Sequence, residues 1–232
     1  MTVLCAYLFG GLALAWDDDP VPPIPGTAAR SLFAYLLTYR HFPHTRNLLV
    51  GTFWPDLPEA TARRRLSRAL WQIRSVLRPP SGDRTQQHDR AQGSSEAPEY
   101  FQAHAAPEVL TTEGDTVQVT PDLRLWLDIE EFTRHSAACV GDETGIIQGC
   151  ERCLELYRGE FLPGYYDDWV IVERERLRGV LLEVLEHLLE GYKAQAEYER
   201  ALVVARRLVT EDPWREEAQR EVMRLCHMLG RD

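Results

Sequence analysis

Two prolines that lie three positions apart constrain the stretch 45–77 more than any other feature of the chain. Pro55 and Pro58 cannot both lie inside one helix, because each lacks a backbone N–H and crowds the preceding turn. The stretch is therefore predicted to form a short helix near 46–53, a tight turn, and a longer helix that ends near Leu77. Pro58 suits the first position of the second helix.

The second helix of this pair is predicted to have two distinct faces. At helical spacing its apolar residues share one side: Ala62, Leu66, Ala69, Leu70, Ile73 and Leu77. The opposite side is polar and basic, with three further arginines at its flanks: Thr61, Arg64, Arg68, Trp71, Gln72, Ser75, then Arg63, Arg65 and Arg74. A solvated basic face on a core helix is one interpretation. A recognition helix for the DNA major groove is the other, because the planar fork of arginine binds guanine or phosphate with two hydrogen bonds.

A second structural signal follows later in the chain and favours the DNA-binding interpretation. Strand-forming residues at 109–112 and 116–119 flank the turn Glu113-Gly114-Asp115, which predicts a β-hairpin. A helix pair followed by such a hairpin is a winged helix. The acidic tip is not suited to bind phosphate. The stretch 79–108 has only Tyr100 and Phe101 as large apolar residues and is predicted to be a flexible insertion before the wing.

Charge is distributed unevenly along the chain, whose formal net charge is −10. Residues 1–78 hold nine arginines and five acidic residues, whereas residues 79–232 hold 17 basic and 31 acidic residues. A basic first third joined to an acidic remainder indicates two modules with different partners. Lys193 is the one lysine, so neither a phosphate-binding P-loop nor a Ser-Lys pair can be built. We also find no paired carboxylates and no Ser/His/Asp set, so we expect a non-enzyme without a cofactor.

The apolar N-terminus, 1–16, is not interpreted as a signal peptide. It lacks a positive leader, and three aspartates follow it at once. No stretch approaches the roughly 20 apolar residues of a membrane span. The sequence therefore predicts a cytoplasmic protein without a membrane partner.

From residue 128 onward the chain is predicted to be almost wholly helical. Asp128 and Glu131 have the spacing of a capping box, and helices are expected near 128–138, 145–158, 167–194, 198–210 and 215–229. Tyr192, Ala201 and Pro213 have the offsets of the 34-residue tetratricopeptide unit. A second tetratricopeptide repeat begins after the first, but the sequence contains only its first helix. The chain is therefore either a fragment of a longer protein or covers this apolar face by other means.

The cysteines leave a thiol or zinc function open as an alternative. Cys150 and Cys153 share a helix face, with Cys139 and His135 within 20 residues. The favoured interpretation is that they are small buried apolar residues, because one CxxC without a second pair is a weak metal signal. The spacing of His41 and His44 is also interpreted without a metal, so no metal site is predicted.

Four stretches resemble the SARP-type family of bacterial antibiotic regulators. They are LFGGLALAWDDDPVPPIPGTAARSLFAYLL at 8–37, FWPDLPEATARRRLSRALWQIRSVL at 53–77, LTTEGDTVQVTPDLRLWLDIEEF at 110–132 and LYRGEFLPGYYDDWVIVERERLR at 156–178. The fourth is similar to the bacterial transcriptional activator domain, and its LYRGEFLPGYYDDW block is the most specific part. The resemblance covers nearly the whole chain outside 79–108.

The resemblance implies a mainly α fold with a small β part. An OmpR-like winged helix-turn-helix would occupy 1–120, and an all-helical, tetratricopeptide-like bacterial transcriptional activator domain would occupy 121–232, truncated as the repeat indicates. It also implies a transcriptional activator that binds short direct repeats near promoters as two copies side by side and recruits RNA polymerase.

The resemblance also assigns functions to individual residues. Double-stranded DNA would be recognised by the second helix of the pair through Thr61, Arg64, Arg65, Arg68 and Trp71. Contacts to the DNA backbone would come from Thr27, Arg30, Thr45 and Arg46. The loop that faces polymerase would contain Trp54, Pro55, Asp56 and Leu57.

An alternative function remains open. The acidic helical domain could be the working surface of a protein–protein interaction module within a larger signalling regulator. The insertion before the wing and the acidic wing tip favour this alternative slightly. Loss of DNA binding on replacing Arg64 and Arg68 would discriminate between the two.

Overall fold

The chain forms two compact units in the computed structural model, which describes residues 2–78, 108–137, 139 and 143–231. The first unit contains Met1–Ala6 and Ala13–Trp126, and the second contains Tyr7–Leu12 and Leu127–Asp232. The predicted insertion at 79–108 lies outside the described residues except for Glu108. The predicted domain boundary after residue 120 stays a prediction.

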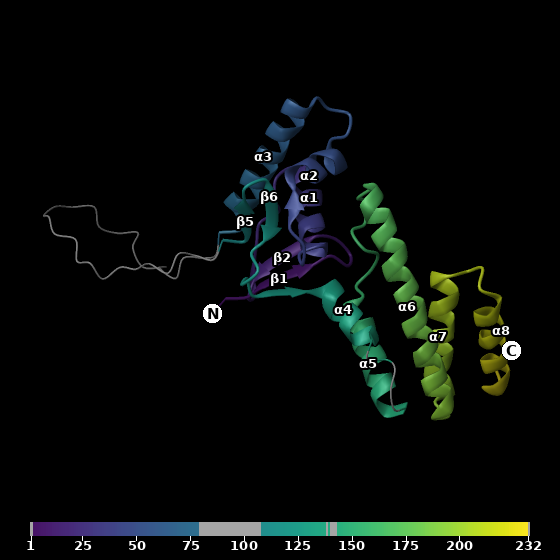
Figure 1. Ribbon diagram of the computed structural model, residues 1–232. Coiled ribbons are helices and arrows are strands. Elements are labelled where there is room, and N and C mark those ends of the chain that lie inside the picture. Colours follow the sequence, from purple (N-terminus) through teal and green to yellow (C-terminus); the bar gives the residue numbers. More distant parts are fainter. Residues whose placement is uncertain (1, 79–107, 138, 140–142, 232) are drawn as a thin grey trace, which may run out of the picture. The chain divides into compact units, whose positions relative to one another are not determined.

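Three helices form the core of the first unit (Figure 1): α1 (Thr27–Thr38), α2 (Arg46–Phe53) and α3 (Glu59–Val76). Both α1 and α2 pack on α3. The side chains between them are fully buried leucines and aromatics, such as Phe33 of α1, Leu49 of α2 and Leu66 of α3. At roughly 25 cal/mol per Å² of buried apolar surface, this burial is what holds the helix pair together.

The helix–turn–helix predicted from the two prolines is confirmed, with one correction. Pro58 is the N-cap of α3 rather than its first helical residue, and its carbonyl accepts hydrogen bonds from the amides of Thr61 (2.8 Å) and Ala62 (3.0 Å). The extended ψ of 136° at Pro58 turns the chain into the helix. The short helix α2 ends at Phe53, as the sequence predicts.

Two small sheets accompany these helices. One has the strand order β3-β2-β1-β7, formed by β1 (Leu4–Tyr7), β2 (Ala13–Trp16), β3 (Asp19–Pro20) and β7 (Leu125–Leu127). The other has the order β4-β6-β5, formed by β4 (His44–Thr45), β5 (Leu110–Glu113) and β6 (Thr116–Val119). Antiparallel β5 and β6 are the predicted hairpin, which turns at Gly114 with φ of 57°.

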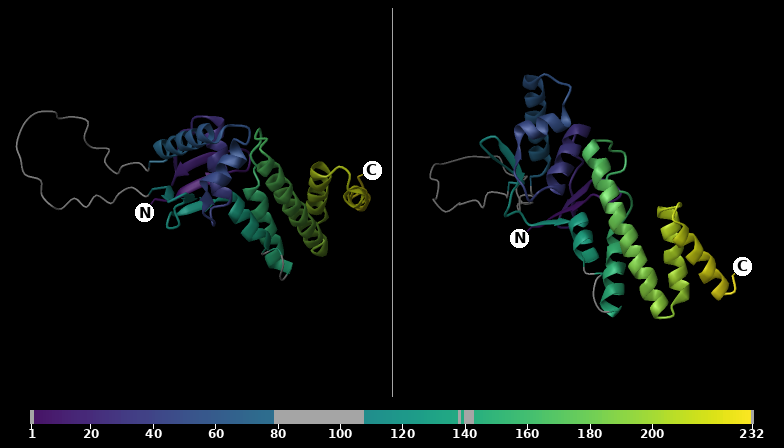
Figure 2. Two further views of the ribbon diagram at one scale, coloured as in Figure 1. Left: turned by 45° about the horizontal axis from the view of Figure 1, so that its top comes forward. Right: turned by 45° about the vertical axis from the view of Figure 1, so that its right-hand side comes forward.

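The second unit contains five helices in the described part of the chain: α4 (Asp128–Ala137), α5 (Glu143–Leu156), α6 (Asp168–Ala194), α7 (Tyr198–Glu211) and α8 (Glu216–Met228). Each packs on the next, so they form successive helical hairpins (Figure 2). Gly191 of α6 allows the close approach to α5, since a Cβ there would lie only 2.8 Å from Cγ1 of Ile147.

One local prediction in this unit is wrong. Asp128 does not form a capping box with Glu131, because its carboxylate accepts hydrogen bonds from the amide of Ile129 and from a distant part of the chain. Among the described residues, no helix combines the length and the apolar composition that crossing a bilayer requires.

Candidate nucleic-acid interface

The exposed face of α3 carries the residues predicted to read DNA. Apolar residues at helical spacing bury the opposite face against α1 and α2. All five predicted residues are exposed: Thr61, Arg64, Arg65, Arg68 and Trp71. The Trp71 side chain is large for such a position and is 68% exposed. The helix is therefore amphipathic in the way the spacing predicts.

Arg63, on the flank of this face, is held within the unit. Its Nε lies 2.9 Å from Oε1 of Glu59, one turn earlier on α3, and its Nη2 donates to Oδ1 of Asn47 on α2 at 2.6 Å. Its Nη1 lies 3.8 Å from Oδ1 of Asp115 at the wing tip. Arg63 thus joins three elements of the first unit and is occupied by these contacts.

Arg74, on the other flank, fastens α3 to the wing. Its Nη2 donates to the carbonyl of Leu110 at 3.2 Å and to Oγ1 of Thr112 at 2.7 Å, both on β5. Its Nε lies 3.3 Å from Oε1 of Glu108, which is a contact between charges without hydrogen-bond geometry. Sequence reasoning missed this role, because Arg74 and the wing are separated by more than 30 residues and no local pattern joins them.

Arg64, Arg65 and Arg68, between these flanks, make no hydrogen bond or ion pair with any residue that the structure describes. Their guanidinium groups are exposed, and no acidic side chain of the described ranges neutralises their charges. A cluster of exposed, uncompensated cations attracts an anionic polymer such as nucleic acid. The unit therefore divides its α3 arginines into two that hold the fold and three that are available.

The residues predicted to contact the DNA backbone lie at two helix starts. Thr45 is the N-cap of α2, and its Oγ1 accepts from the amide of Leu48 at 3.2 Å. Arg46 follows it as the first helical residue, and its amide donates to the carbonyl of Asp115 at 2.8 Å. Two of the amides at the start of α2 are therefore already hydrogen-bonded within the unit.

The start of α1 carries the other two predicted backbone contacts. Thr27 is exposed and is the first residue of α1, and the helix has no side-chain cap. Nη2 of Arg30 lies 3.4 Å from Oγ1 of Thr27, while the buried Nε of Arg30 has no hydrogen-bond partner in the described part. Arg30 is thus only weakly held by its own unit.

The four predicted polymerase-contact residues in the turn between α2 and α3 differ in their exposure to solvent. Pro55 and Asp56 are exposed, and Leu57 is half-buried. Trp54 is only 7% exposed, and its ring lies 5.9 Å from the ring of Phe53. The Trp54 side chain therefore belongs to the core of the turn rather than to a surface that a partner could touch.

The thiol alternative rests on three cysteines in the second unit. Cys139, Cys150 and Cys153 are buried, as the favoured interpretation predicted. Burial raises the pKa of the Cys150 thiol and that of Cys153, the latter to about 12. Such thiols remain protonated and unreactive at neutral pH. In the described residues no group of three or more His, Cys, Asp or Glu side chains could hold a metal ion.

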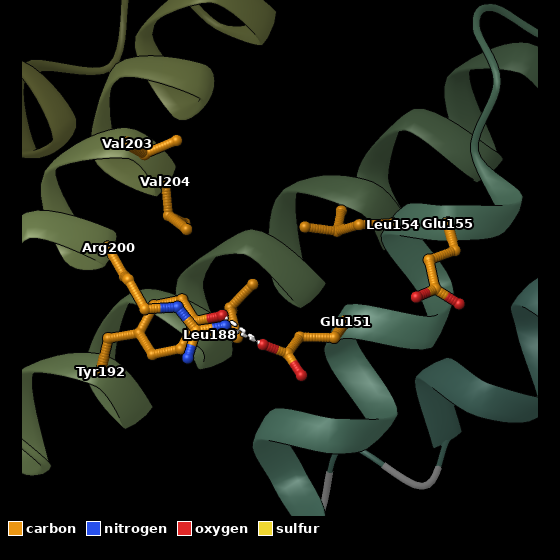
Figure 3. Close-up of a pocket in the computed structure, with 8 residues that line it drawn as sticks. All are labelled: Glu151, Leu154, Glu155, Leu188, Tyr192, Arg200, Val203 and Val204. Atoms are coloured by element: carbon orange, nitrogen blue, oxygen red, sulfur yellow. Dashed lines mark hydrogen bonds and ion pairs between the residues drawn. The ribbon is translucent and has the colours of Figure 1, made fainter. Parts of the chain in front are cut away.

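An open groove of about 580 Å³ lies between α5, α6 and α7 (Figure 3). Leu154, Leu188 and Val204 supply its apolar lining. At one end the Tyr192 hydroxyl donates to Oε1 of Glu151 at 2.6 Å, and Arg200 pairs with the same carboxylate. Arg200 also lies 4.2 Å above the Tyr192 ring. These polar groups satisfy one another and therefore brace the three helices.

The comparisons with known proteins agree with this architecture. Residues 127–232 match the family model described as the bacterial transcriptional activator domain. The match covers the second unit apart from Tyr7–Leu12 and leaves residues 1–126 outside it. This match agrees with the prediction of a bacterial transcriptional activator domain in the C-terminal part of the chain.

The fold is also similar to a solved structure, "Mycobacterium tuberculosis EmbR in complex with low affinity phosphopeptide". The TM-score is 0.74 at 19% sequence identity, and the similarity covers 100% of this chain and 56% of that one. The chain thus spans little more than half the length of that protein. The predicted fold class, a winged domain followed by a helical domain, is confirmed. A search of curated proteins found no match.

Proposed function

We propose that this regulator is a cytoplasmic, sequence-specific DNA-binding transcriptional activator that inserts α3 into the major groove. The observation that carries the proposal is the division among the α3 arginines. Arg63 and Arg74 are engaged inside the unit, whereas Arg64, Arg65 and Arg68 are exposed and without a partner in the described part. On a helix that is only solvated, we would expect paired and unpaired arginines to be mixed along its exposed face.

Within this proposal, the unpartnered arginines and Trp71 contact base edges. Arginine pairs with O6 and N7 of guanine, and an apolar ring contacts the methyl group of thymine. Thr27, Arg30, Thr45 and Arg46 contact phosphates and set the position of α3 along the duplex. Phosphate contacts of this kind supply most of the affinity and make it fall steeply with salt.

Activation follows in the proposal from two copies on direct repeats that recruit RNA polymerase. The exposed Pro55 and Asp56 of the α2–α3 turn, with Leu57 beside them, are the candidate polymerase surface. The buried Trp54 supports this turn from inside. Substituting Asp56 should then lower activation without lowering DNA affinity.

Selection from random-sequence duplex DNA, repeated over a salt series, tests the proposal. We expect enrichment of a short direct repeat, and an affinity that declines linearly on a log–log plot against salt. Failure to enrich any motif with the folded protein would contradict sequence-specific binding. Binding that does not respond to salt would contradict the phosphate contacts.

The groove of Figure 3 favours the alternative, in which the acidic helical unit docks a protein partner. The exposed Val203 and the carboxylate of Glu155 at its edge would then contact that partner. A substitution in the groove distinguishes the DNA-binding function from the protein-docking function. Replacing Val203 by a charged residue would abolish regulation in the alternative while leaving DNA binding intact.

A further inference from the structure

The most specific sequence block of the chain, LYRGEFLPGYYDDW, lies outside the DNA-binding proposal and needs its own explanation. We propose that its loop 158–164 and the start of α4 form a socket for Tyr7–Leu12, so that this N-terminal hexapeptide is a structural part of the activator domain. The inference is independent of the proposed DNA binding, because all the contacts that carry it lie within the second unit.

Backbone hydrogen bonds join the hexapeptide to the loop in the manner of an added strand. The amide of Gly10 donates to the carbonyl of Glu160 at 2.9 Å, and the amide of Leu162 donates to the carbonyl of Leu8 at 3.0 Å. Phe9 and Phe161 form an antiparallel bridge between these two bonds. The pairing joins two segments that are separated by about 150 residues in the sequence.

Asp128 holds the hexapeptide from the other side. Its Oδ2 accepts from the amides of Leu8 (2.8 Å) and Phe9 (2.9 Å), and its Oδ1 accepts from the amide of Ile129 (2.8 Å). The side chain is 1% exposed, so these N–H groups replace the water that the carboxylate has lost. A buried carboxylate that binds two amides of another segment is a specific anchor for that segment.

Aromatic packing fills the centre of the socket. The Phe9 ring lies 5.1 Å from the Phe132 ring at 75°, and 4.8 Å from the Tyr157 ring at 51°. Phe9 and Phe132 are buried. The guanidinium of Arg158 also lies 4.6 Å from the centre of the Tyr7 ring. Removing Phe9 would leave an apolar cavity between α4 and the end of α5.

Two glycines of positive φ lie where the two backbones touch. Gly10 has φ of 77°, and a Cβ there would lie 3.4 Å from the carbonyl oxygen of Arg158. Gly159 has φ of 145°, and a Cβ there would lie 3.5 Å from the Cα of Gly10. The Gly-Gly of the hexapeptide and the Arg-Gly of the block are therefore two sides of one contact.

Arg174 of α6 fixes the shape of the socket loop. Its guanidinium donates to the carbonyls of Phe161 (3.1 Å), Leu162 (2.9 Å) and Tyr165 (3.2 Å), and lies 3.2 Å from Oε1 of Glu160. The loop is thus hydrogen-bonded to Arg174 of α6 on one side and to the hexapeptide on the other. The domain that the family model matches from residue 127 onward therefore includes a further segment from the N-terminus.

Amide hydrogen exchange in the full chain tests this inference. With Phe9→Ala we expect exchange of the α4 amides and of Leu162 to become about tenfold faster or more. Phe42→Ala removes an exposed ring from the first unit and should leave these amides unchanged. If Phe9→Ala speeds exchange in Tyr7–Leu12 alone, with α4 and 158–164 still protected, the hexapeptide is only a connector and the inference is wrong.

A second pair of variants remains informative if Phe9→Ala does not fold. Gly10→Ala and Gly11→Ala both strain a backbone of positive φ, but only Gly10 faces the socket, since nothing lies within 4 Å of a Cβ at Gly11. Gly10→Ala should accelerate exchange at 158–162 more than Gly11→Ala does, because only the methyl group at Gly10 touches the loop. Equal acceleration by Gly10→Ala and Gly11→Ala would contradict the proposed contact between Gly10 and the loop.

Asp128→Asn provides an independent measurement of the anchor. The Leu8 and Phe9 amides should lose protection, whereas Asp122→Asn at an exposed position should leave them protected. Unchanged protection of both amides in Asp128→Asn would show that the carboxylate does not hold the segment.

Discussion

Arginine has different surroundings in the middle of α3 and in α6 and α8 of the second unit. The described arginines of α6 and α8 each lie within hydrogen-bond or ion-pair distance of a glutamate, as in Arg176–Glu173 at 2.5 Å and Arg220–Glu216 at 2.6 Å. In the middle of α3, by contrast, Arg64, Arg65 and Arg68 have no such partner in the described part. Whether an exposed arginine keeps an unpaired guanidinium group is therefore set by its neighbours and not by its exposure alone.

The sharpest test of this contrast replaces matched pairs in the two units. Arg64→Ala plus Arg68→Ala removes two unpartnered cations one helical turn apart, and should lower specific DNA affinity about a hundredfold or more, at roughly 1–3 kcal/mol for each base contact. Arg220→Ala plus Arg224→Ala has the same spacing on α8 and should leave affinity unchanged. Fluorescence anisotropy on a selected duplex measures both. Equal losses in the two double variants would show that an unpartnered arginine of α3 contributes no more to DNA binding than a paired one of α8.

Asp128 is a buried charged residue whose hydrogen-bond partners are backbone amides rather than an arginine. Burial raises the pKa of its carboxyl to about 6 from 3.8, although three N–H groups and Arg158 favour the charged form. Because the folded state then binds the proton more readily than the unfolded chain, the contribution of Asp128 to stability should rise as the pH falls from 7 towards 4. The gain relative to Asp128→Asn should reach about 3 kcal/mol in the free energy of unfolding.

Urea unfolding of the two proteins at several pH values measures this difference, and the effects of other titrating groups cancel in the comparison. If the wild type instead loses stability relative to Asp128→Asn between pH 7 and pH 5, the backbone hydrogen bonds outweigh the effect of burial.

Arg74→Ala tests whether a partnered arginine of α3 has a structural role. The variant loses the hydrogen bonds to Leu110 and Thr112, and should lower the free energy of unfolding by about 1 kcal/mol, since the side chain is partly exposed. Arg68→Ala should leave stability unchanged. Thermal unfolding compares the two variants. A destabilised Arg68→Ala would show that this arginine has a structural partner after all.

The smallest expected effect concerns the wing tip. Asp115 lies 3.8 Å from Arg63, so in the proposed DNA complex its negative charge would lie close to the duplex. Asp115→Asn should raise DNA affinity about two- to fourfold at low salt, and the gain should vanish at high salt because screening removes the repulsion. Asp122→Asn is the control. A loss of affinity in Asp115→Asn would mean that the carboxylate positions Arg63 for DNA.

Local patterns predicted much of this protein. The bounds of α2, the hairpin β5–β6 and the succession of helices after Asp128 follow from proline positions, strand-forming runs and helical spacing. The exposed face of α3 follows from the same periodicity, because side chains three or four positions apart lie on one side of a helix. The burial of Cys150 and Cys153 was also predicted correctly.

Contacts between distant segments were not predicted. The Glu59–Arg63 spacing of one helical turn was a signal that Arg63 is paired, but nothing local links Arg74 to Thr112. The capping-box spacing at Asp128 gave the wrong partner, because the amides of Leu8 and Phe9 compete for the same carboxylate. Trp54 was expected in a contact loop, although its large apolar ring is more stable inside the turn.

The sequence by itself determined the order of the elements, the two-sided character of α3 and the activator-domain match, since these depend on residue spacing and on local blocks of the chain. Only the tertiary structure decided which arginines are available and that Tyr7–Leu12 belongs with the activator domain. The physical reason is the same for both. Hydrogen bonds and buried aromatic contacts between distant segments depend on where the fold places their atoms. The spacing of residues along the sequence does not predict these positions.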